Sequence, residues 1–512
     1  MNAAHRRLRR AWFAPLSFAL AVAGCSGAPQ DSGAATAATP LPTSAPTASP
    51  APPPWTPAQR AALTQALGAT LDADVLQDGA GLAVVSADGT TLFAHRAGVP
   101  LAPASTLKLI VAASALNAYG PQHRFTTRFL ALAPPDERGE LHGPLWLVGG
   151  GDPLLTSTDL RAGVGALVRA GVTRIDGPVI LDDTAFSGPG INPHWESDDL
   201  DEAYAAPTSA FSLDGNTIEF HVTPGASGEP ALVTIEPAND LVHLDGSIAT
   251  VSSSSDSFVT IDRAAAYPPT AARSSSNAFH LDGRIAAGET QKFWKPVTNV
   301  KEYVLGSLKL MLAERGIASD GELESGPAPL AAQPLWTHRS QPLSAIVAEM
   351  LTNSNNHSAE QLLRTLPGLS GKPGTDANGV SAERRELARL GISRAGMTVY
   401  DGSGLSPDDR VEPIELAKLV AAELAAPAGP DFLRGLPRVG LDGTVVYHNL
   451  SDALGRTRAK SGHIDGVNGL VGTVLTHHHG RVAFAFIVND PRYLAGAITD
   501  EEDKALDELA DF

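Results

Sequence analysis

The sequence predicts an α/β (α+β) protein whose antiparallel sheet, flanked by helices, is interrupted by a mainly β insert. Residues 81–86 and 90–95 alternate around an Asp-Gly turn, which is typical of a β-hairpin. A second hairpin is predicted where apolar runs at 470–476 and 481–488 are joined by a short polar turn. Hairpins towards both ends of the chain indicate one sheet that both ends complete.

Helices are predicted beside these hairpins and ahead of two polar motifs. They cover residues 56–67, 103–120, 342–350 and the acidic stretch from about 499. Thr56 and Pro57 supply an N-cap and a first-turn proline for the first helix. The second helix is nearly all apolar up to Gly120, so we expect it to be buried.

The middle of the chain, from about residue 121 to 291, predicts an inserted all-β region. Its short β-like runs are separated by Gly, Pro, Asp and Ser, and they cover residues 178–181, 217–222, 231–235 and 258–261. A fixed-period repeat is not evident, which argues against a solenoid.

The composition indicates a folded, acidic protein. With 512 residues the chain exceeds what one hydrophobic core usually supports, and 43% of its residues are apolar. Its net charge of -18 argues against nucleic acid as a partner, because nucleic-acid binders present basic patches.

The first 25 residues predict an export signal. Four arginines precede an apolar run at 11–22 that is too short to span a membrane. The run ends in Val-Ala-Gly-Cys25, which resembles a bacterial lipobox, so Cys25 is the expected lipidation site. Cys25 is the only cysteine, which excludes disulfides within the chain. The alternative is an ordinary signal peptide in which Cys25 occurs by chance.

These observations divide the chain into five regions. We expect a lipoprotein signal peptide at 1–24, a disordered Ala/Pro/Ser/Thr tether at 25–55, a first segment of the catalytic domain at 56–120, the inserted β region at 121–291 and a second segment of the catalytic domain at 292–512.

The first motif that carries chemistry is Ser105-Thr106-Leu107-Lys108, at the start of the apolar helix. Residues three apart share a helix face, so Lys108 can meet Ser105. A desolvated lysine has a lowered pKa and can take the proton of a serine nucleophile. Of the nine lysines, only Lys108 stands three residues after a serine. Chance pairing on an amphipathic helix is the alternative for this motif alone.

The second motif is Ser354-Asn355-Asn356, which follows the helix predicted at 342–350. Its serine hydroxyl can relay a proton, and its asparagine amide can hold a peptide carbonyl. Ser275-Ser276-Asn277 matches the same pattern but lies in a Ser-rich loop of the insert without a neighbouring helix, so we discount it.

The third motif is Lys460-Ser461-Gly462-His463, which leads into the last hairpin. A strand here presents a cation and a hydroxyl to a substrate carboxylate, and the glycine lets the substrate backbone approach. A solvent-facing lysine at a strand edge is an equal alternative for this motif alone. The order S-x-x-K, S-x-N and K-S-G is together a specific signal for a serine acyltransferase.

With these three motifs the chain resembles the D-alanyl-D-alanine carboxypeptidase and endopeptidase family of class C penicillin-binding proteins. Positions 105 and 354 are separated by 249 residues, and this large insert selects that branch of the family. Similar glycine-containing stretches support the resemblance, and we interpret them as turns: residues 149–156, 206–210, 359–363, 401–406 and 440–444.

The resemblance implies a penicillin-binding/β-lactamase-like fold, with Ser105 attacking the penultimate D-alanine of peptidoglycan stem peptides and Lys108 accepting its proton. It further implies these roles: Ser354 and Lys460 pass a proton to the departing D-alanine, Asn356 orients the acyl chain, Ser461 binds the terminal carboxylate, and the backbone N–H groups of Ser105 and His463 form the oxyanion hole. β-Lactam antibiotics would trap Ser105 covalently, without any cofactor or metal.

One departure and two alternatives accompany this resemblance. The family motif usually reads Lys-Thr-Gly-Thr, whereas here Ser461 and His463 replace both threonines. A serine β-lactamase and a catalytically silent peptidoglycan-binding envelope protein are the competing hypotheses. Residues 477–479 are three consecutive histidines on a predicted solvated turn, where they do not converge as metal ligands.

Overall fold

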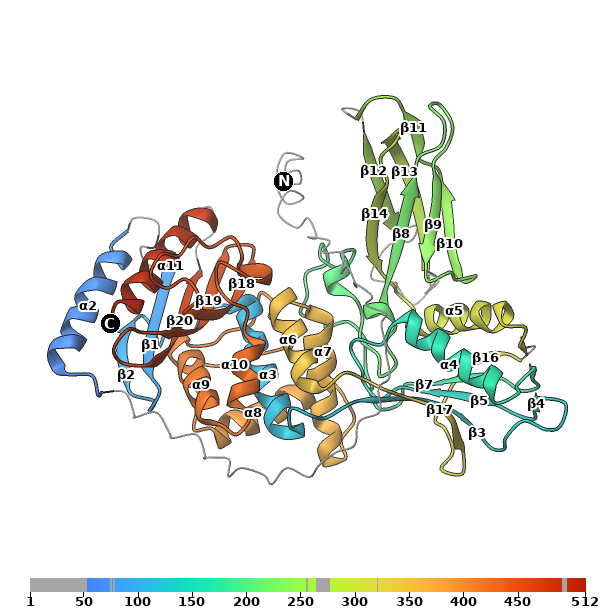
Figure 1. Ribbon diagram of the computed structural model, residues 1–512, viewed down its shortest axis with the longest axis horizontal. Coiled ribbons are helices and arrows are strands. Elements are labelled where there is room, and N and C mark those ends of the chain that lie inside the picture. Colours follow the sequence, from blue (N-terminus) through green and yellow to red (C-terminus); the bar gives the residue numbers. More distant parts are fainter. Residues whose placement is uncertain are drawn as a thin grey trace, which may run out of the picture. The chain divides into compact units, whose positions relative to one another are not determined.

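The computed structural model describes residues 53–73, 76, 79–254, 257–263, 277–319, 321–489 and 495–512 (Figure 1). The chain divides into a unit of residues 1–51 and a unit of residues 52–512, and all elements below belong to the second. The predicted signal peptide, Cys25 and the tether up to residue 52 lie outside the described residues, as do Ser275 and Ser276.

The sheet that we predicted for the catalytic domain is built from both ends of the second unit, as expected. Its five strands are antiparallel and follow the order β18 (Thr457–Ile464), β19 (Val467–Leu475), β20 (Arg481–Asn489), β1 (Ala80–Ser86) and β2 (Thr91–His95). Pairing between β1 and β20 joins the two hairpins, so the sheet is complete only when residues about 400 positions apart in the sequence pair with each other. Strand β18 therefore forms one edge of the sheet.

Two helical layers cover this sheet. Helices α2 (Pro57–Leu71) and α11 (Ala495–Ala510) share a core with one face, which includes Leu67, Phe484 and Phe486. The opposite core contains Val111, Ala485 and Ile487, and its helices are α3 (Lys108–Tyr119), α6 (Leu343–Asn353), α7 (Asn356–Thr365), α8 (Asp376–Arg389), α9 (Pro413–Ala425) and α10 (Gly429–Gly435) (Figure 1). Alternating side chains of one strand thus serve two cores.

The polar turn between β19 and β20 is less solvated than predicted. His477 and His478 are exposed, but His479 is buried. Its ring stacks on Trp55 with a centroid distance of 4.4 Å, and its Nε2 lies 2.8 Å from Nε2 of Gln59. His479 therefore fixes the start of helix α2 to this turn, and the expectation of a solvated turn was wrong for this residue.

The inserted region has a core of its own, and this core is not purely β. A five-stranded sheet follows the order β16 (Leu323–Ser325), β7 (Val179–Asp182), β5 (Leu145–Val148), β3 (Thr126–Ala131) and β17 (Gln333–Arg339). Helices α4 (Ser157–Arg169) and α5 (Val300–Glu314) belong to the same core, in which Leu160, Leu167 and Leu308 are buried.

The expected boundary at residue 291 falls inside this second core. Strand β17 pairs with β3, and buried residues up to Ile317 pack with Phe129. The sequence pattern did not reveal this boundary, because the end of the insert is defined by strand pairing between distant segments rather than by a change in composition. We place the end of the insert near residue 340.

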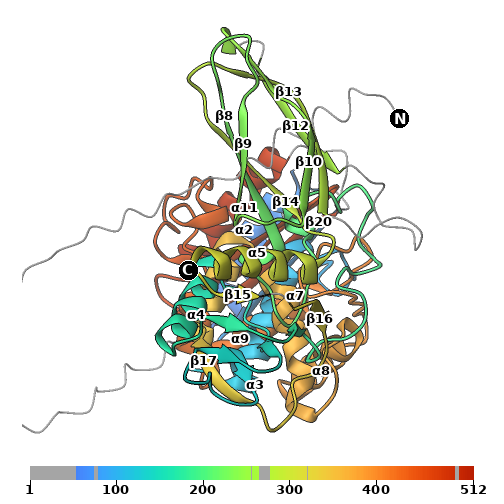
Figure 2. The ribbon, with the colours of Figure 1, turned by 90° about the vertical axis from the view of Figure 1, so that its right-hand side faces the viewer.

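The predicted β runs from 217 onwards form two small sheets. One is ordered β14 (Gln291–Pro296), β8 (Thr217–Thr223) and β9 (Leu232–Glu236), and the other joins β10 (Val242–Gly246), β11 (Ala249–Val251) and β12 (Phe258–Arg263) to β13 (Asn277–Ala286) (Figures 1 and 2). Tyr303 of α5 donates a hydrogen bond to the Thr217 carbonyl at 2.8 Å, which ties the first of these sheets to the insert core. Within the described residues, no helix is long and apolar enough to cross a membrane.

Candidate active site

Ser105 lies in a 3₁₀ turn rather than at the start of the α-helix itself. The turn covers Ala104–Leu107, and α3 begins at Lys108. The Thr106 N–H and hydroxyl both donate to the Pro103 carbonyl, which tightens the chain here. The backbone before Ser105 is unusual, because Ala104 adopts a positive φ of 46°. The half-buried Ser105 is thus held in a constrained turn next to a helix N-terminus.

Lys108 is directed at Ser105, as the motif spacing predicts. Its Nζ donates to three oxygens: Ser105 Oγ at 2.8 Å, Asn356 Oδ1 at 2.7 Å and the Ser403 carbonyl at 2.7 Å. An ammonium group has three donors, so all three protons are assigned. Loss of one proton leaves a lone pair that can accept the Ser105 proton.

The surroundings of Lys108 favour the neutral amine. The side chain is fully buried, and this burial lowers the pKa of Lys108 to about 7, against the opposing attraction of Asp401 and Glu360. A group with this pKa is populated in both protonation states near neutral pH. Lys108 therefore meets the geometric and the electrostatic requirement for a general base.

The second motif occupies the connection between α6 and α7. Ser354 ends α6 in the left-handed conformation, with φ 55° and ψ 38°. The Asn355 side chain caps α7 by accepting from the Ser358 N–H at 2.9 Å. Asn356 follows as the first residue of α7 and accepts from Lys108. The strained turn and the cap together place Asn356 beside the lysine, although the two are 248 residues apart in the sequence.

The third motif lies on the edge strand β18. Lys460 is fully buried, and its Nζ donates to the Ser461 carbonyl at 2.6 Å. Burial and the nearby charge of Lys108 lower the pKa of Lys460 well below its ordinary range. The two lysines of the motifs are thus electrostatic neighbours.

Gly462 lies close to the protein's own backbone at the turn that carries Ser105. A Cβ atom at this position would lie 2.7 Å from the Pro103 carbonyl oxygen and 3.0 Å from the Ser105 nitrogen. The absence of a side chain therefore lets the turn that carries Ser105 approach strand β18. This contact brings the first and third motifs together.

The backbone N–H of His463 faces the outer edge of the sheet, away from β19. Along β18 the Ala459 N–H donates outward, to the Pro437 carbonyl at 3.1 Å. Backbone groups of an antiparallel strand alternate in direction, so the N–H groups of Ser461 and His463 point to the same edge. The His463 ring is exposed.

Sequence reasoning missed a set of buried carboxyl groups behind Lys108. Glu360 Oε1 accepts from the Gly402 N–H at 3.0 Å and from the Ser403 N–H at 2.8 Å. Asp401 accepts from the Gly404 and Ser406 N–H groups at 2.7 and 2.8 Å. The 401–406 stretch is therefore a shaped turn that presents the Ser403 carbonyl to Lys108. Only its Asp-Gly-Ser-Gly composition signalled a turn, and its partner Glu360 is far away in the sequence.

Two substitutions of Glu360 distinguish the contribution of its hydrogen-bond acceptor from that of its charge. Burial, and then the charge of Asp401, raise the pKa of Glu360 to about 8, so the neutral acid predominates at pH 7. Glu360→Gln keeps a neutral acceptor, and we expect a melting temperature close to that of the wild type. Glu360→Ala leaves two buried N–H groups unpaired and should destabilise the fold by about 2–4 kcal/mol. Thermal unfolding at pH 7 checks this, and equal effects of both substitutions would contradict it.

The insert also contributes to the site. The Tyr204 carbonyl accepts from Asn356 Nδ2 at 3.1 Å, and Trp195 Nε1 donates to Asp401 at 2.9 Å. Gln361 Nε2 donates to Ser209 and Ser212, both of which belong to the insert. The segment from about 189 to 212 therefore packs on helix α7 and fixes its first residue.

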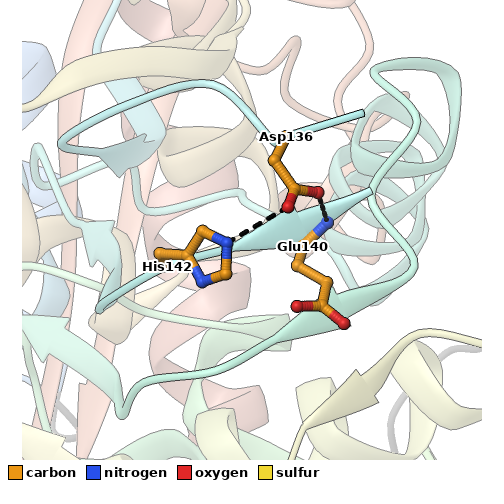
Figure 3. Close-up of side chains that lie close together, drawn as sticks. All are labelled: Asp136, Glu140 and His142. Carbon is orange, nitrogen blue, oxygen red and sulfur yellow. Dashed lines mark hydrogen bonds and ion pairs between the residues drawn. The ribbon is translucent and has the colours of Figure 1, made fainter. Parts of the chain in front are cut away.

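A separate polar cluster lies in the insert, distant from these motifs in the sequence. Asp136, Glu140 and His142 place one ligand-type atom each within 4.8 Å of one another (Figure 3). Asp136 accepts from the Arg138 and Glu140 N–H groups at 2.9 Å, and His142 Nε2 lies 3.2 Å from its other oxygen. These bonds account for the cluster as a turn-stabilising arrangement on the surface.

The chain matches known proteins over most of its length. The sequence pattern of the D-Ala-D-Ala carboxypeptidase 3 (S13) family matches residues 63–511. The chain belongs to this family. It is a serine-type D-Ala-D-Ala carboxypeptidase of the class C penicillin-binding type.

Two relatives and one solved structure illustrate the match. The chain is 31% identical over 462 residues to the D-alanyl-D-alanine carboxypeptidase of Actinomadura sp. strain R39, covering 84% of this chain and 83% of that one. It is 26% identical to the D-alanyl-D-alanine carboxypeptidase DacB of Haemophilus influenzae, covering 75% and 80%. The crystal structure of penicillin binding protein 4 from Haemophilus influenzae has the same fold, with a TM-score of 0.74 at 23% identity, covering 88% of this chain and 99% of that one.

Proposed function

We propose that Ser105 is the nucleophile of this carboxypeptidase and that Lys108 is its general base. The observation that carries this proposal is the 2.8 Å contact between Lys108 Nζ and Ser105 Oγ, combined with the burial that lowers the pKa of Lys108 to about 7. The neutral amine takes the Ser105 proton as the oxygen attacks the carbonyl of the penultimate D-alanine. The peptide nitrogen leaves with a proton, and an acyl group stays on Ser105.

The other motif residues fit the remaining needs of this step. Lys460 and Ser354 deliver the proton to the departing D-alanine, and Asn356 orients the acyl chain. Ser461 binds the terminal carboxylate of the substrate. The Ser105 N–H, in the first turn of a helical segment, and the His463 N–H, at the outer edge of β18, serve as the oxyanion hole.

The substrates we propose are the stem peptides of peptidoglycan, and β-lactams are the expected covalent inhibitors. A crystal structure of the Haemophilus influenzae penicillin binding protein 4 contains a β-lactam, which supports this proposal. The fully buried Lys108 and Lys460 argue against a catalytically silent binding protein, because removing two amines from water costs free energy that a role in catalysis would explain.

Release of D-alanine from a pentapeptide that ends in D-Ala-D-Ala tests the proposal. We expect the wild-type protein to release D-alanine and Ser105→Ala to lose this activity while it keeps the wild-type melting temperature. A serine β-lactamase would instead turn over a chromogenic cephalosporin rapidly and release no D-alanine. Activity that survives in Ser105→Ala would reject the assignment of the nucleophile.

We further propose that the protein is exported and anchored through a lipid on Cys25, on the periplasmic or extracellular face of the envelope. The arginine-led apolar run and the Val-Ala-Gly-Cys25 ending support this. Processing at Cys25 would remove residues 1–24 with their four arginines and change the net charge from -18 to -22.

Substitution of the lipobox cysteine tests the anchor. Cys25→Ala should block processing and lipidation, so the protein should leave the detergent-phase membrane fraction and retain the mass of residues 1–24. Mass spectrometry and fractionation measure both effects. A wild-type protein whose measured mass contains no acyl groups on Cys25 would exclude a lipid anchor.

A further inference from the structure

The loop that precedes strand β18 is held firmly against the active site. The short turn Gly443–Val445 follows Asp442, and the Gly440 N–H donates to the Val445 carbonyl at 2.9 Å. Gly443 has a positive φ of 50°, and a Cβ atom there would lie 2.2 Å from the Thr352 carbonyl oxygen. This close approach locks the loop onto the end of helix α6, so the side chain of Thr444 has a defined position.

Thr444 makes its polar contact with the hydroxyl that we assign to the substrate carboxylate. Its Oγ1 lies 3.0 Å from Ser461 Oγ, and its carbonyl lies 3.4 Å from the same atom. The second contact is long for a hydroxyl donor, whose usual distance is about 2.7–2.8 Å. The Thr444 hydroxyl is therefore the closer partner of Ser461.

The direction of this hydrogen bond decides what Ser461 can offer. A hydroxyl has one proton and accepts through two lone pairs. If the Thr444 hydroxyl donates to Ser461 Oγ, the Ser461 proton is free to point to a carboxylate. Ser461 is also a residue that needs such help, because its side chain is not branched at Cβ and rotates more freely than a threonine.

We propose that Thr444 is a positioning residue for carboxylate recognition, whose hydroxyl donates to Ser461 Oγ and aligns the Ser461 proton with the terminal carboxylate of the substrate or of a β-lactam. This inference rests on the proposed function, because it takes the role of Ser461 from there. If Thr444 has this role, its loss should affect only ligands that carry the carboxylate. A residue that only stabilised the loop would affect all ligands equally.

The test compares benzylpenicillin with its methyl ester, which lacks the free carboxylate. We expect Thr444→Val, which is nearly isosteric, to lower the second-order rate of acylation by benzylpenicillin about threefold to tenfold, the loss of one neutral hydrogen bond. The rate with the ester should stay within about twofold of the wild type. Thr444→Ser, which keeps the hydroxyl, should restore the rate with benzylpenicillin.

Two further variants make the result specific. Thr457→Val is the matched control, because Thr457 lies on the same strand as Ser461 and its hydroxyl donates to the Ala453 carbonyl, at 3.2 Å, rather than to a motif residue. It should change neither rate. In a Ser461→Ala background, Thr444→Val should have no additional effect on benzylpenicillin. If Thr444→Val does not fold, Thr444→Ala is measured in its place.

An equal loss with both ligands, no loss with benzylpenicillin, or an additive effect in the Ser461→Ala background would overturn the role of Thr444. These outcomes differ from a failure of the proposed function itself. In that case the wild-type protein would not be acylated by benzylpenicillin at all.

Discussion

Lys108→Met should lower the rate of acylation by a D-Ala-D-Ala peptide about 10²–10⁴-fold, which is the usual contribution of a positioned general base. Methionine fills a similar buried volume but has no amine, so Ser105 loses its proton acceptor. Stopped-flow or single-turnover measurement of acyl-enzyme formation gives the rate. The wild-type rate should fall as the pH drops below about 7, because Lys108 then becomes protonated.

The sign of this pH effect follows from the cause of the shift. Burial lowers the pKa of Lys108 to about 7, so the neutral, basic form increases as the pH rises through that value. The acylation rate of Lys108→Met should not show this rise with pH. Lys372→Ala is the control, since Lys372 is exposed and outside the motifs. A Lys108→Met enzyme whose acylation rate and pH dependence match the wild type would show that another group is the base.

Asn356→Asp should shift the rise of the acylation rate with pH to higher pH. Asn356 Oδ1 lies 2.7 Å from Lys108 Nζ, so a carboxylate at this position stabilises the ammonium form and raises the pKa of Lys108. At pH 7 we expect a loss of acylation rate of about 5- to 500-fold, because an opposite charge raises a neighbouring pKa by about 1–3 and so lowers the fraction of neutral Lys108. The rate should recover partly at pH 9.

Two comparisons isolate this charge effect. Asn356→Ala removes the acceptor without adding charge, so its loss should be similar across the pH range. Asn353→Asp adds the same charge at an exposed position at the end of α6, and its pH profile should match the wild type. A pH profile of Asn356→Asp that keeps the wild-type midpoint would contradict the proposed coupling between Asn356 and Lys108.

The three motifs could be predicted from the sequence because each is defined by short-range spacing. Lys108 follows Ser105 by three residues, and Asn356 follows Ser354 by two, so helix and loop geometry fix their local relation. The five-stranded sheet was also predictable from hairpin patterns at both ends. The structure confirms that sheet and the predicted contact between Lys108 and Ser105. The contact between Lys108 and Asn356 is an addition that the spacing alone did not predict.

The remainder of the site depends on contacts that leave no local pattern. Glu360 meets the 401–406 turn 42 residues away, and Thr444 meets Ser461 17 residues away. The Tyr204 carbonyl comes from the insert, and any residue type could supply a carbonyl there. Strands β16 and β17 return to the insert sheet after helix α5, and only tertiary pairing reveals this. Backbone groups and buried acids are therefore identified by the fold rather than by the sequence.

In the proposed reaction Ser105 becomes acylated with the help of Lys108. The most direct test is intact-protein mass spectrometry after incubation with benzylpenicillin, followed by peptide mapping. We expect one adduct of the mass of the intact antibiotic, located on Ser105 and absent from Ser105→Ala. Folded wild-type protein that forms no adduct, or an adduct on another residue, would contradict the account.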